Sequence, residues 1–251
     1  MDQLKQKPVV IYQDNFLLVL NKPPNWVVNR AQTTKNQQTI QDWLEDNFSR
    51  LSGIPLWRDN FRSGIVHRLD KDTSGILLIA KTKKTFENLQ AQFKKRQVKK
   101  EYRALIHGVL PLSDKITAPV GRLPWARKKF GVLPGGRAAE TEFKLMGVFE
   151  KDGEKFSLVQ VFPKTGRTHQ IRVHFRYLDY PLVADFTYGG RKRARNDQKW
   201  CPRIFLHAQK IGFFHPQSGK WQEYEVELPK DLKDALGILE PIVNNRSESI
   251  R

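Results

Sequence analysis

Cysteine and long apolar runs are almost absent from this sequence of 251 residues. The single cysteine, Cys201, excludes an internal disulfide and any zinc site built from several cysteines. No uninterrupted apolar stretch approaches the ~20 residues that a helix needs to cross a bilayer, and the N-terminal Met-Asp-Gln-Leu-Lys has no apolar signal-peptide core. We therefore predict a cytoplasmic protein that does not enter a membrane.

Acidic residues are scarce relative to basic ones. The chain has 26 Asp and Glu against 44 Lys and Arg, which gives a formal net charge of +18. Hydrophobic residues make up 39% and charged residues 28%, as in a folded globular domain. The positive excess predicts a polyanionic partner and binding that weakens with salt.

The most informative stretch runs from Gly64 to Lys81 and places a polar cluster between two apolar runs. The second run, Ile76–Ala80, is short, rich in Ile and Leu and preceded by Gly75, which is typical of a buried strand. Loops braced by a rigid scaffold often carry catalytic groups. A carboxylate beside an arginine stays ionised, so Asp70 is a candidate nucleophile, general base or metal ligand. The alternative is a turn whose charges are simply solvated.

A second alternative comes from the run Asp70-Lys71-Asp72-Thr73, which fits the Asp-x-Asp-x-Thr signature of magnesium-dependent phosphatases of the haloacid dehalogenase type. That signature needs a buried strand that leads directly into the first aspartate. His67 and Arg68 interrupt the approach here, which disfavours the phosphatase.

The same segment, His-Arg-Leu-Asp-Lys-Asp-Thr-Ser-Gly over residues 67–75, resembles the catalytic motif of the RluA-type pseudouridine synthases. An apolar strand and Ala-Lys follow it, as they do in that family. The resemblance implies that Asp70 is the catalytic aspartate.

Two further segments resemble the same family. Lys100 to Gly108 matches its Lys-x-Tyr-x-Ala-x-x-x-Gly pattern, and by resemblance Tyr102 packs on the target base. Composition alone favours a core tyrosine on a strand instead. Gly-Arg-Thr-His-Gln-Ile-Arg-Val-His over residues 166–174 matches in full, and resemblance makes Arg172 the partner of the catalytic carboxylate. Arginine suits that task because it stays charged and offers a planar fork of donors.

The helical period from Thr168 onward predicts a core face and a cationic face. Ile171, His174, Phe175 and Leu178 share the first, whereas His169, Arg172 and Arg176 share the second. His169 and His174 would then lie on different faces without an acidic third ligand nearby, so we predict no metal site there. The resemblance also implies that no cofactor is needed.

Two departures from the family pattern fall shortly after Leu20. Asn25 stands where the family has Gly, and asparagine tolerates the left-handed conformation that glycine would supply. Asn29 stands where His is common. We expect these changes to affect the substrate loop rather than the chemistry.

The remaining pattern predicts secondary structure along the whole chain. We expect a hairpin over Val9–Leu20, helices over Thr39–Leu51 and Thr85–Val98, and a strand over Glu101–Gly108. Beyond it we expect strands within Ile116–Gly147, over Phe156–Phe162 and over Ile204–Ala208, an alternating strand over Trp221–Leu228 and a short helix within Pro229–Leu239. Arg191 to Pro202 is predicted to be a flexible basic loop, Ala184 to Gly190 a structural turn, and Asn244 to Arg251 a loose tail.

Clustered cations form the candidate RNA surface, chiefly at the end of the second expected helix and in the basic loop. The candidate RNA-binding residues are Lys22, Arg68, Lys94, Lys95, Arg96, Lys99, Lys100, Arg167, His169, Arg191, Lys192 and Arg193. Lys128, Lys129 and Arg137 are expected to add phosphate contacts.

Together the resemblance implies a mixed α/β (α+β) domain with a largely antiparallel, bent sheet, flanking helices and a central cleft. It covers about residues 9–230, so we predict one catalytic domain over residues 1–251. Because only a short segment precedes Val9, we expect the small S4-type RNA-binding domain that many relatives carry to be absent.

The function so implied is isomerisation of uridine to pseudouridine in ribosomal or transfer RNA, by a monomer that needs neither metal nor cofactor. The residues leave open whether Asp70 attacks the substrate or removes a sugar proton. A catalytically silent RNA-binding protein or RNA chaperone is the alternative.

Overall fold

The computed structural model describes residues 6–31, 37–48 and 62–242, which divide into two units. Unit 1 contains residues 1–100 and 207–227, and unit 2 contains residues 101–206 and 228–251. Each is described by itself below. The end of the helix expected over Thr39–Leu51 and the expected tail from Asn244 to Arg251 lie outside the described residues.

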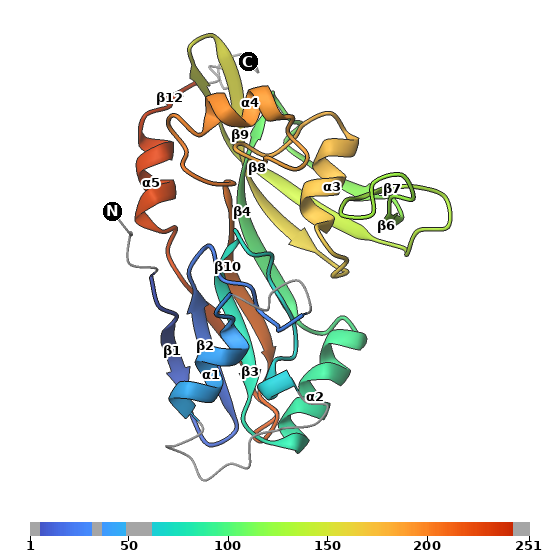
Figure 1. Ribbon diagram of the computed structural model, residues 1–251, viewed down its shortest axis with the longest axis vertical. Helices are drawn as coiled ribbons and strands as arrows, with labels where there is room; N and C mark the ends of the chain where they lie inside the picture. The colour runs from blue at the N-terminus through green and yellow to red at the C-terminus, as the bar shows by residue number, and fades with distance from the viewer. Residues whose placement is uncertain (1–5, 32–36, 49–61, 243–251) are drawn as a thin grey trace, which may run out of the picture. The chain divides into compact units, whose positions relative to one another are not determined.

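The sheet of unit 1 has the order β1-β2-β3-β10, with β11 paired to β10. The β3–β10 pair is parallel and the other pairs are antiparallel. Figure 1 shows α1 and α2 beside these strands. The elements are β1 (Val9–Gln13), β2 (Leu17–Lys22), α1 (Ile40–Phe48), a 3-10 turn (Arg62–Gly64), β3 (Ser74–Ala80), α2 (Lys83–Lys94), β10 (Leu206–Phe214) and β11 (Trp221–Glu225).

Local hydrogen bonds explain why α1 begins where it does. The Asp42 amide donates to the Thr39 hydroxyl at 3.1 Å, and the Thr39 amide donates to the Asp42 carboxylate at 2.7 Å. This reciprocal pair satisfies amides that have no partner inside the helix. The pair explains the start of the helix expected from Thr39, and the predicted hairpin of β1 and β2 is confirmed.

Every residue of β3 is buried, as expected for a strand covered on both faces. From α2, Phe86 and Leu89 join Ile76 and Leu78 of β3 in one apolar cluster. Gly75 permits the close approach of β10, because a Cβ at its φ of +118° would lie 2.1 Å from the Ala208 carbonyl oxygen. The strand that follows the candidate catalytic loop is thus fixed in its core.

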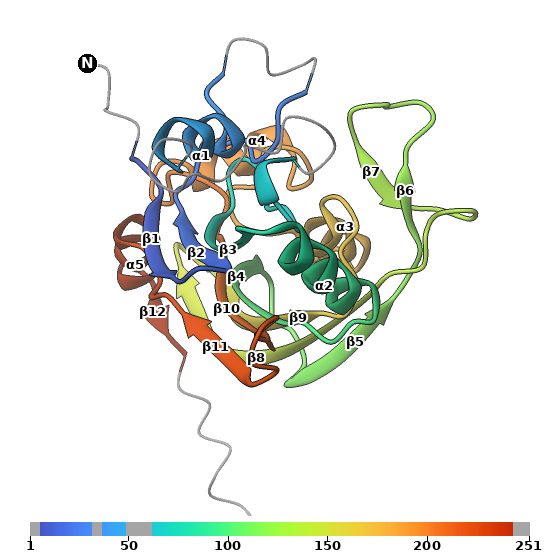
Figure 2. The same ribbon diagram turned by 90° about the horizontal axis from the view of Figure 1, so that it is seen from below.

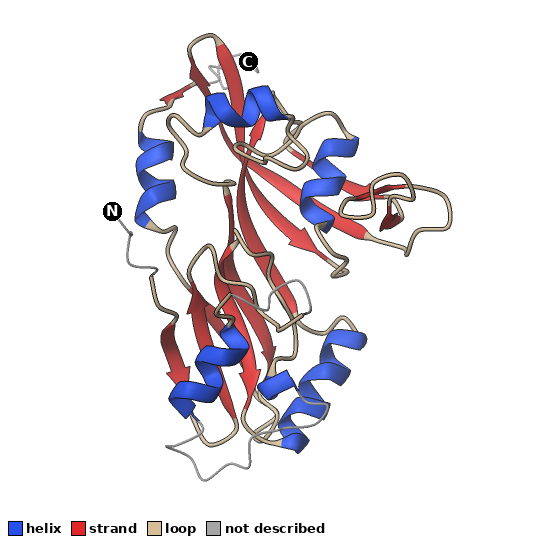
Figure 3. Cartoon of the chain, in the orientation of Figure 1, coloured by secondary structure: helices blue, strands red, loops and turns tan. Residues whose placement is uncertain are grey.

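Unit 2 contains the antiparallel strands β4-β9-β8-β12, in that order, with β5 on β8 and a separate β6–β7 hairpin. Figure 2 shows that hairpin beside α3, and Figure 3 shows the mixture of helices and strands. The elements are β4 (Lys99–His107), β5 (Ser113–Thr117), β6 (Val120–Arg122), β7 (Phe130–Val132), β8 (Glu140–Lys151), β9 (Glu154–Pro163), α3 (Gln170–Tyr177), α4 (Arg191–Asp197), α5 (Lys230–Gly237) and β12 (Glu240–Pro241).

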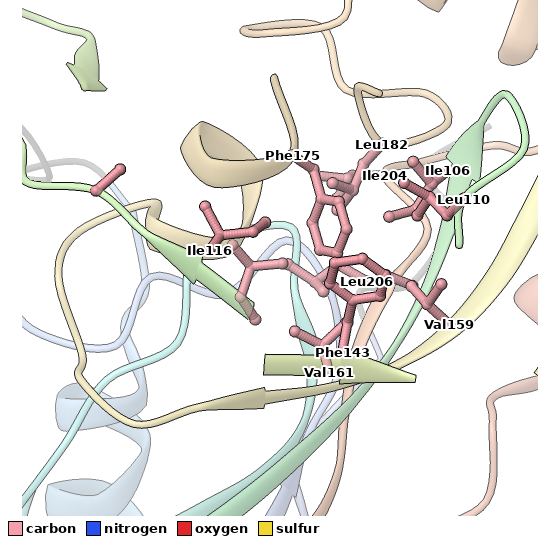
Figure 4. Packing of buried hydrophobic residues seen from close by; sticks show 13 residues of the cluster. Ile106, Leu110, Ile116, Phe143, Val159, Val161, Phe175, Leu182, Ile204 and Leu206 are labelled. Atoms are coloured by element: carbon pink, nitrogen blue, oxygen red, sulfur yellow. The ribbon is translucent and has the colours of Figure 1, made fainter. Parts of the chain in front are cut away.

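Helices cover both faces of the unit 2 sheet. Ile106 of β4 belongs to the cluster that includes Phe175 of α3, whereas its neighbour Leu105 belongs to the cluster that includes Leu232 of α5. Successive strand residues point to opposite faces, so α3 and α5 lie on opposite sides. Figure 4 shows Phe175 packed on Phe143 of β8, with ring centroids 5.4 Å apart.

The predicted mixed α+β class with a mostly antiparallel sheet is confirmed. Some expectations are wrong in detail. The strand expected over Ile204–Ala208 is β10 over Leu206–Phe214. The helix expected over Thr85–Val98 spans Lys83–Lys94, because the Thr82 hydroxyl accepts the Thr85 amide at 3.1 Å and Arg96 is left-handed with φ of 58°. The segment from Arg191, expected to be a flexible loop, forms α4 over Arg191–Asp197.

Candidate active site

Asp70 lies on the loop that leads into β3 of unit 1. Its backbone carbonyl accepts the Thr73 amide at 3.2 Å, which closes a tight turn, and its side chain is half-buried. Arg68 is exposed on the same loop, whereas Leu69 is buried. The strand follows Asp70 and does not precede it, since the segment before it has only a bridge at Ile65. The arrangement therefore lacks the strand that the phosphatase signature requires.

His67 holds one side of this loop. Its Nε2 accepts the Leu78 amide of β3 at 2.9 Å, and its ring lies 4.9 Å from that of Phe93. Burial, together with the charge of Lys100, lowers the pKa of His67 from 6.5 to about 3. A ring nitrogen that accepts an amide N–H cannot itself carry a proton, so geometry and pKa agree on a neutral imidazole with the proton on Nδ1.

Lys22 and Ser74 hold the other side. The Lys22 ammonium donates to the carbonyls of Pro23 at 3.0 Å, Trp26 at 3.1 Å and Lys71 at 3.1 Å, and Lys22 is fully buried. The Ser74 hydroxyl bonds Nδ1 of His207 on β10 at 2.8 Å. The expectation that Lys22 contacts RNA is wrong, because its ammonium is enclosed by main-chain carbonyls. It braces the Asp70 loop instead.

Asn25, in the turn after β2, has φ of 66°. This is the left-handed conformation predicted for a residue that replaces glycine.

Arg172 of unit 2 is buried, with 7% of its surface exposed. Its Nε and Nη2 donate to the two oxygens of Asp185, each at 2.8 Å. The expected exposed cationic face of α3 is therefore wrong at Arg172, although Arg176 is exposed as predicted. Asp70 and Arg172 belong to different units, so their pairing stays a prediction.

A second residue of the Asp185 turn contacts Arg172. The Tyr188 ring centroid lies 5.0 Å from the guanidinium carbon, and the Tyr188 hydroxyl bonds His169 Nδ1 at 2.8 Å. The same hydroxyl accepts the Phe130 amide of β7 at 3.1 Å. His169, expected to bind RNA, is half-buried and holds this tyrosine.

The segment before α3 is fixed by Gln170. Its carboxamide oxygen accepts the Thr165 hydroxyl at 2.7 Å and the Arg167 amide at 3.0 Å, and its nitrogen donates to the Glu140 carbonyl at 3.0 Å. Arg167 is half-buried, with Nε bonded to the Ala138 carbonyl at 3.1 Å.

His174 has a structural environment rather than that of a metal ligand. Its Nε2 bonds the Ala118 carbonyl at 3.0 Å and its Nδ1 bonds the Thr141 hydroxyl at 2.9 Å, while burial lowers its pKa. Among the described residues, no three His, Cys, Asp or Glu side chains gather as a metal ion would need. No helix in the described ranges is long and apolar enough to cross a membrane.

Tyr102 lies on β4 of unit 2, opposite Val161 of β9, and is half-buried against the cluster that contains Phe175. Its placement fits both a core tyrosine and a residue with one accessible face. Lys100, two residues earlier, is half-buried, and burial lowers its pKa to about 8. It is less available to phosphate than expected.

The other candidate RNA-binding cations are at the surface. In unit 1, Lys94, Lys95 and Arg96 are exposed at the end of α2, and Lys99 is exposed at the start of β4. In unit 2, Arg191, Lys192 and Arg193 of α4, with Lys129 and Arg176, line a hollow of ≈ 910 Å³. On the β6–β7 loop, Trp125 is 79% exposed between Arg122 and Arg127. Lys128 and Arg137 are also exposed.

Asp185 and Tyr188 were missed as site residues by the sequence analysis. The segment Ala184-Asp185-Phe186-Thr187-Tyr188-Gly189 was taken for a structural turn. Ala184 does have the positive φ, 56°, that such a turn requires. The sequence did contain a signal for this pair. It was an acidic residue in a turn that follows a helix containing an arginine.

This chain is similar to known proteins over most of its length. A model described as RNA pseudouridylate synthase matches residues 16–177. An uncharacterized RNA pseudouridine synthase of Chloroflexus aurantiacus is 41% identical over 216 residues, covering 86% of this chain and 64% of the relative. Ribosomal large subunit pseudouridine synthase D of Neisseria meningitidis serogroup B is 36% identical over 237 residues, covering 92% of this chain and 60% of the relative.

Among solved structures, human RNA pseudouridylate synthase domain containing 1 has a TM-score of 0.72 and 26% sequence identity. The match covers 96% of this chain and 91% of that chain. The present chain spans less than two thirds of the length of the two curated relatives above.

Proposed function

The chain belongs to the RNA pseudouridylate synthase family, and from that premise we propose that it converts uridine to pseudouridine within an RNA chain, with Asp70 as the catalytic aspartate. The observation that carries the proposal is the Asp70 loop. It matches the family motif over residues 67–75 and is held from both sides by His67, Lys22 and Ser74.

The reaction is an isomerisation, so no atom is gained or lost. The bond between N1 of uracil and C1′ of ribose breaks, and a bond between C5 and C1′ forms. The proton of C5 leaves and N1 gains one. An aspartate carboxylate serves here either by attacking the substrate or by removing a sugar proton, and in both routes it acts as an anion.

We assign Arg172 to a position beside the Asp70 carboxylate. The fork with Asp185 fixes the plane of its guanidinium, and the Tyr188 ring covers one face. Arginine offers five donors, so a guanidinium held by one carboxylate still has donor geometry for a second. The target base must leave its stack, at a cost of a few kcal/mol, and we assign Tyr102 to stack against it.

RNA is the proposed partner, and ribosomal RNA is the preferred substrate class because the Neisseria relative is named for the ribosomal large subunit. Transfer RNA is the second candidate. The exposed cations at the end of α2 and around the hollow beside α4 are assigned to phosphates, which position RNA without reading its sequence. The protein is proposed to act in the cytoplasm as a monomer, through a single catalytic domain.

Incubation of unmodified total RNA with the full chain, followed by mapping of pseudouridines, tests the proposal. We expect new pseudouridine at one or a few uridines of ribosomal RNA, and none with Asp70→Asn. RNA binding without any new pseudouridine would leave the catalytically silent RNA-binding protein as the function.

A further inference from the structure

Among the described residues, Asp185 is the most deeply buried carboxylate that the proposed reaction leaves without a role, with 1% of its surface exposed. Its Oδ1 accepts the amides of Thr187 at 2.9 Å and Tyr188 at 3.0 Å, as well as Arg172 Nη2. Its Oδ2 accepts Arg172 Nε. The amides of its own turn thus hold the Asp185 carboxylate in addition to its bonds with the guanidinium.

Burial of the Arg172–Asp185 pair costs desolvation free energy, and the fork holds both side chains in one orientation. The side chains of Arg172 and Asp185 are 8% and 0% exposed. Two charges removed from water need excellent geometry to recover their desolvation cost, and a bidentate fork provides it. Such a pair is weak evidence for stability, so its value has to be sought in the orientation that it imposes.

One short turn constrains Arg172 on two sides. Asp185 binds the edge of the guanidinium, while Tyr188, three residues later, covers its face at 5.0 Å. Tyr188 is itself held through its hydroxyl by His169 and the Phe130 amide. These contacts leave the guanidinium little freedom to rotate.

We propose that Asp185 is a positioning residue for the isomerisation: it holds the Arg172 guanidinium in the plane from which Arg172 meets the catalytic carboxylate. The inference rests on the proposed function, in which Arg172 acts beside Asp70. Asp185 contacts no reacting atom in this scheme and acts only through Arg172. Its loss therefore slows the chemical step and leaves the affinity for RNA unchanged.

The test uses four variants of the full chain: Asp185→Asn, Asp185→Glu, Arg172→Gln and the double variant Asp185→Asn/Arg172→Gln. Single-turnover rates of pseudouridine formation and RNA dissociation constants are measured for each. We expect Asp185→Asn to lose about 100-fold in rate, because a misplacement of about 1 Å costs that much. Asp185→Glu keeps the charge at a longer reach and recovers part of the rate. The double variant is no slower than Arg172→Gln alone.

Asp231→Asn is the matched control. It breaks another arginine fork of unit 2, in which Arg203 donates to Asp231 at 2.6 and 3.2 Å and in which neither Arg172 nor Asp185 takes part. We expect it to lower the free energy of unfolding and to leave the rate per folded molecule unchanged. If Asp185→Asn does not fold, Asp185→Glu compared with Asp231→Asn at equal folded fraction carries the test.

Three outcomes overturn the inference: a wild-type rate in Asp185→Asn, losses that add in the double variant, or a weaker RNA affinity that accounts for the whole effect. Failure of the proposed function is distinguishable from these. In that case the wild-type chain forms no pseudouridine, or Arg172→Gln retains the wild-type rate.

Discussion

The two units hold their candidate site residues by different means. In unit 1 the Asp70 loop is secured by side chains that bond main-chain groups: the His67 imidazole accepts the Leu78 amide, and the Lys22 ammonium donates to three carbonyls. In unit 2 Arg172 is secured by an opposite charge, the Asp185 carboxylate, in a nearly dry environment. The printed bonds that brace the Asp70 loop therefore end on main-chain groups, whereas the Arg172 guanidinium is oriented by a carboxylate.

Asp70→Asn is expected to have the largest effect. The amide keeps the size of the side chain but removes the anion, so pseudouridine formation should fall by more than about 10³-fold while RNA binding survives. Quantification of nucleosides after digestion measures the loss. Asp72→Asn is the control, because Asp72 is exposed on the same loop and should tolerate the change. Turnover near the wild-type level in Asp70→Asn would remove Asp70 from the reaction.

Arg172→Lys is expected to have the next largest effect, a loss of about 100-fold in rate. Lysine keeps the charge but presents it as a point, so it cannot form the fork with Asp185 or present a fixed plane. Arg203→Lys, at the partly buried fork with Asp231, should lose stability and keep its rate per folded molecule. Equal rates for Arg172→Lys and the wild-type chain would contradict the role given to the guanidinium.

Substitution of the exposed cations is expected to change affinity and not the chemical step. Lys94→Gln with Lys95→Gln should weaken RNA binding, and the slope of log K against log salt should fall by about 0.7–0.9 for each lost phosphate contact. Lys115→Gln with Lys144→Gln, exposed on β5 and β8, is the control of equal charge. Equal slopes for both pairs would show that the end of α2 is no RNA contact.

The smallest effect concerns the stability of the Asp70 loop toward acid. His67 has a pKa of about 3 when folded and 6.5 as its reference value, so the unfolded chain binds a proton that the folded chain rejects. The free energy of unfolding should therefore fall as the pH drops from 6.5 toward 3. His67→Gln, whose carboxamide oxygen can accept the Leu78 amide, should lack this component. Urea titrations at several pH values measure the difference, and identical curves would contradict the neutral imidazole.

Local features were predictable from the sequence because neighbouring residues decide them. The capping pair of Thr39 and Asp42, the left-handed Asn25 and the buried strand after Gly75 all depend on contacts within a few residues. The loop that carries Asp70 was predictable for the same reason.

Features that depend on distant contacts were not predictable. A single apolar face was assumed for α3, but the turn with Asp185 covers its other side and buries Arg172. The run from Arg191 carries no apolar period, and α4 is anchored by Ala194 and by Asp197, whose carboxylate bonds His107 at 3.0 Å and the Ala184 amide at 2.8 Å. A cation such as Lys22 is assigned to the surface by default, and its burial depends on carbonyls that only the fold brings together.

The most direct test of catalysis by Asp70 follows the proton that leaves C5 of uracil. Ribosomal RNA transcribed with tritium at C5 of uridine is incubated with the full chain, and tritium released to water is counted. We expect the wild-type chain to release tritium in an amount equal to the pseudouridine formed, and Asp70→Asn to release none. Release that is undiminished in Asp70→Asn, or no release from ribosomal or transfer RNA with the wild-type chain, would contradict this expectation.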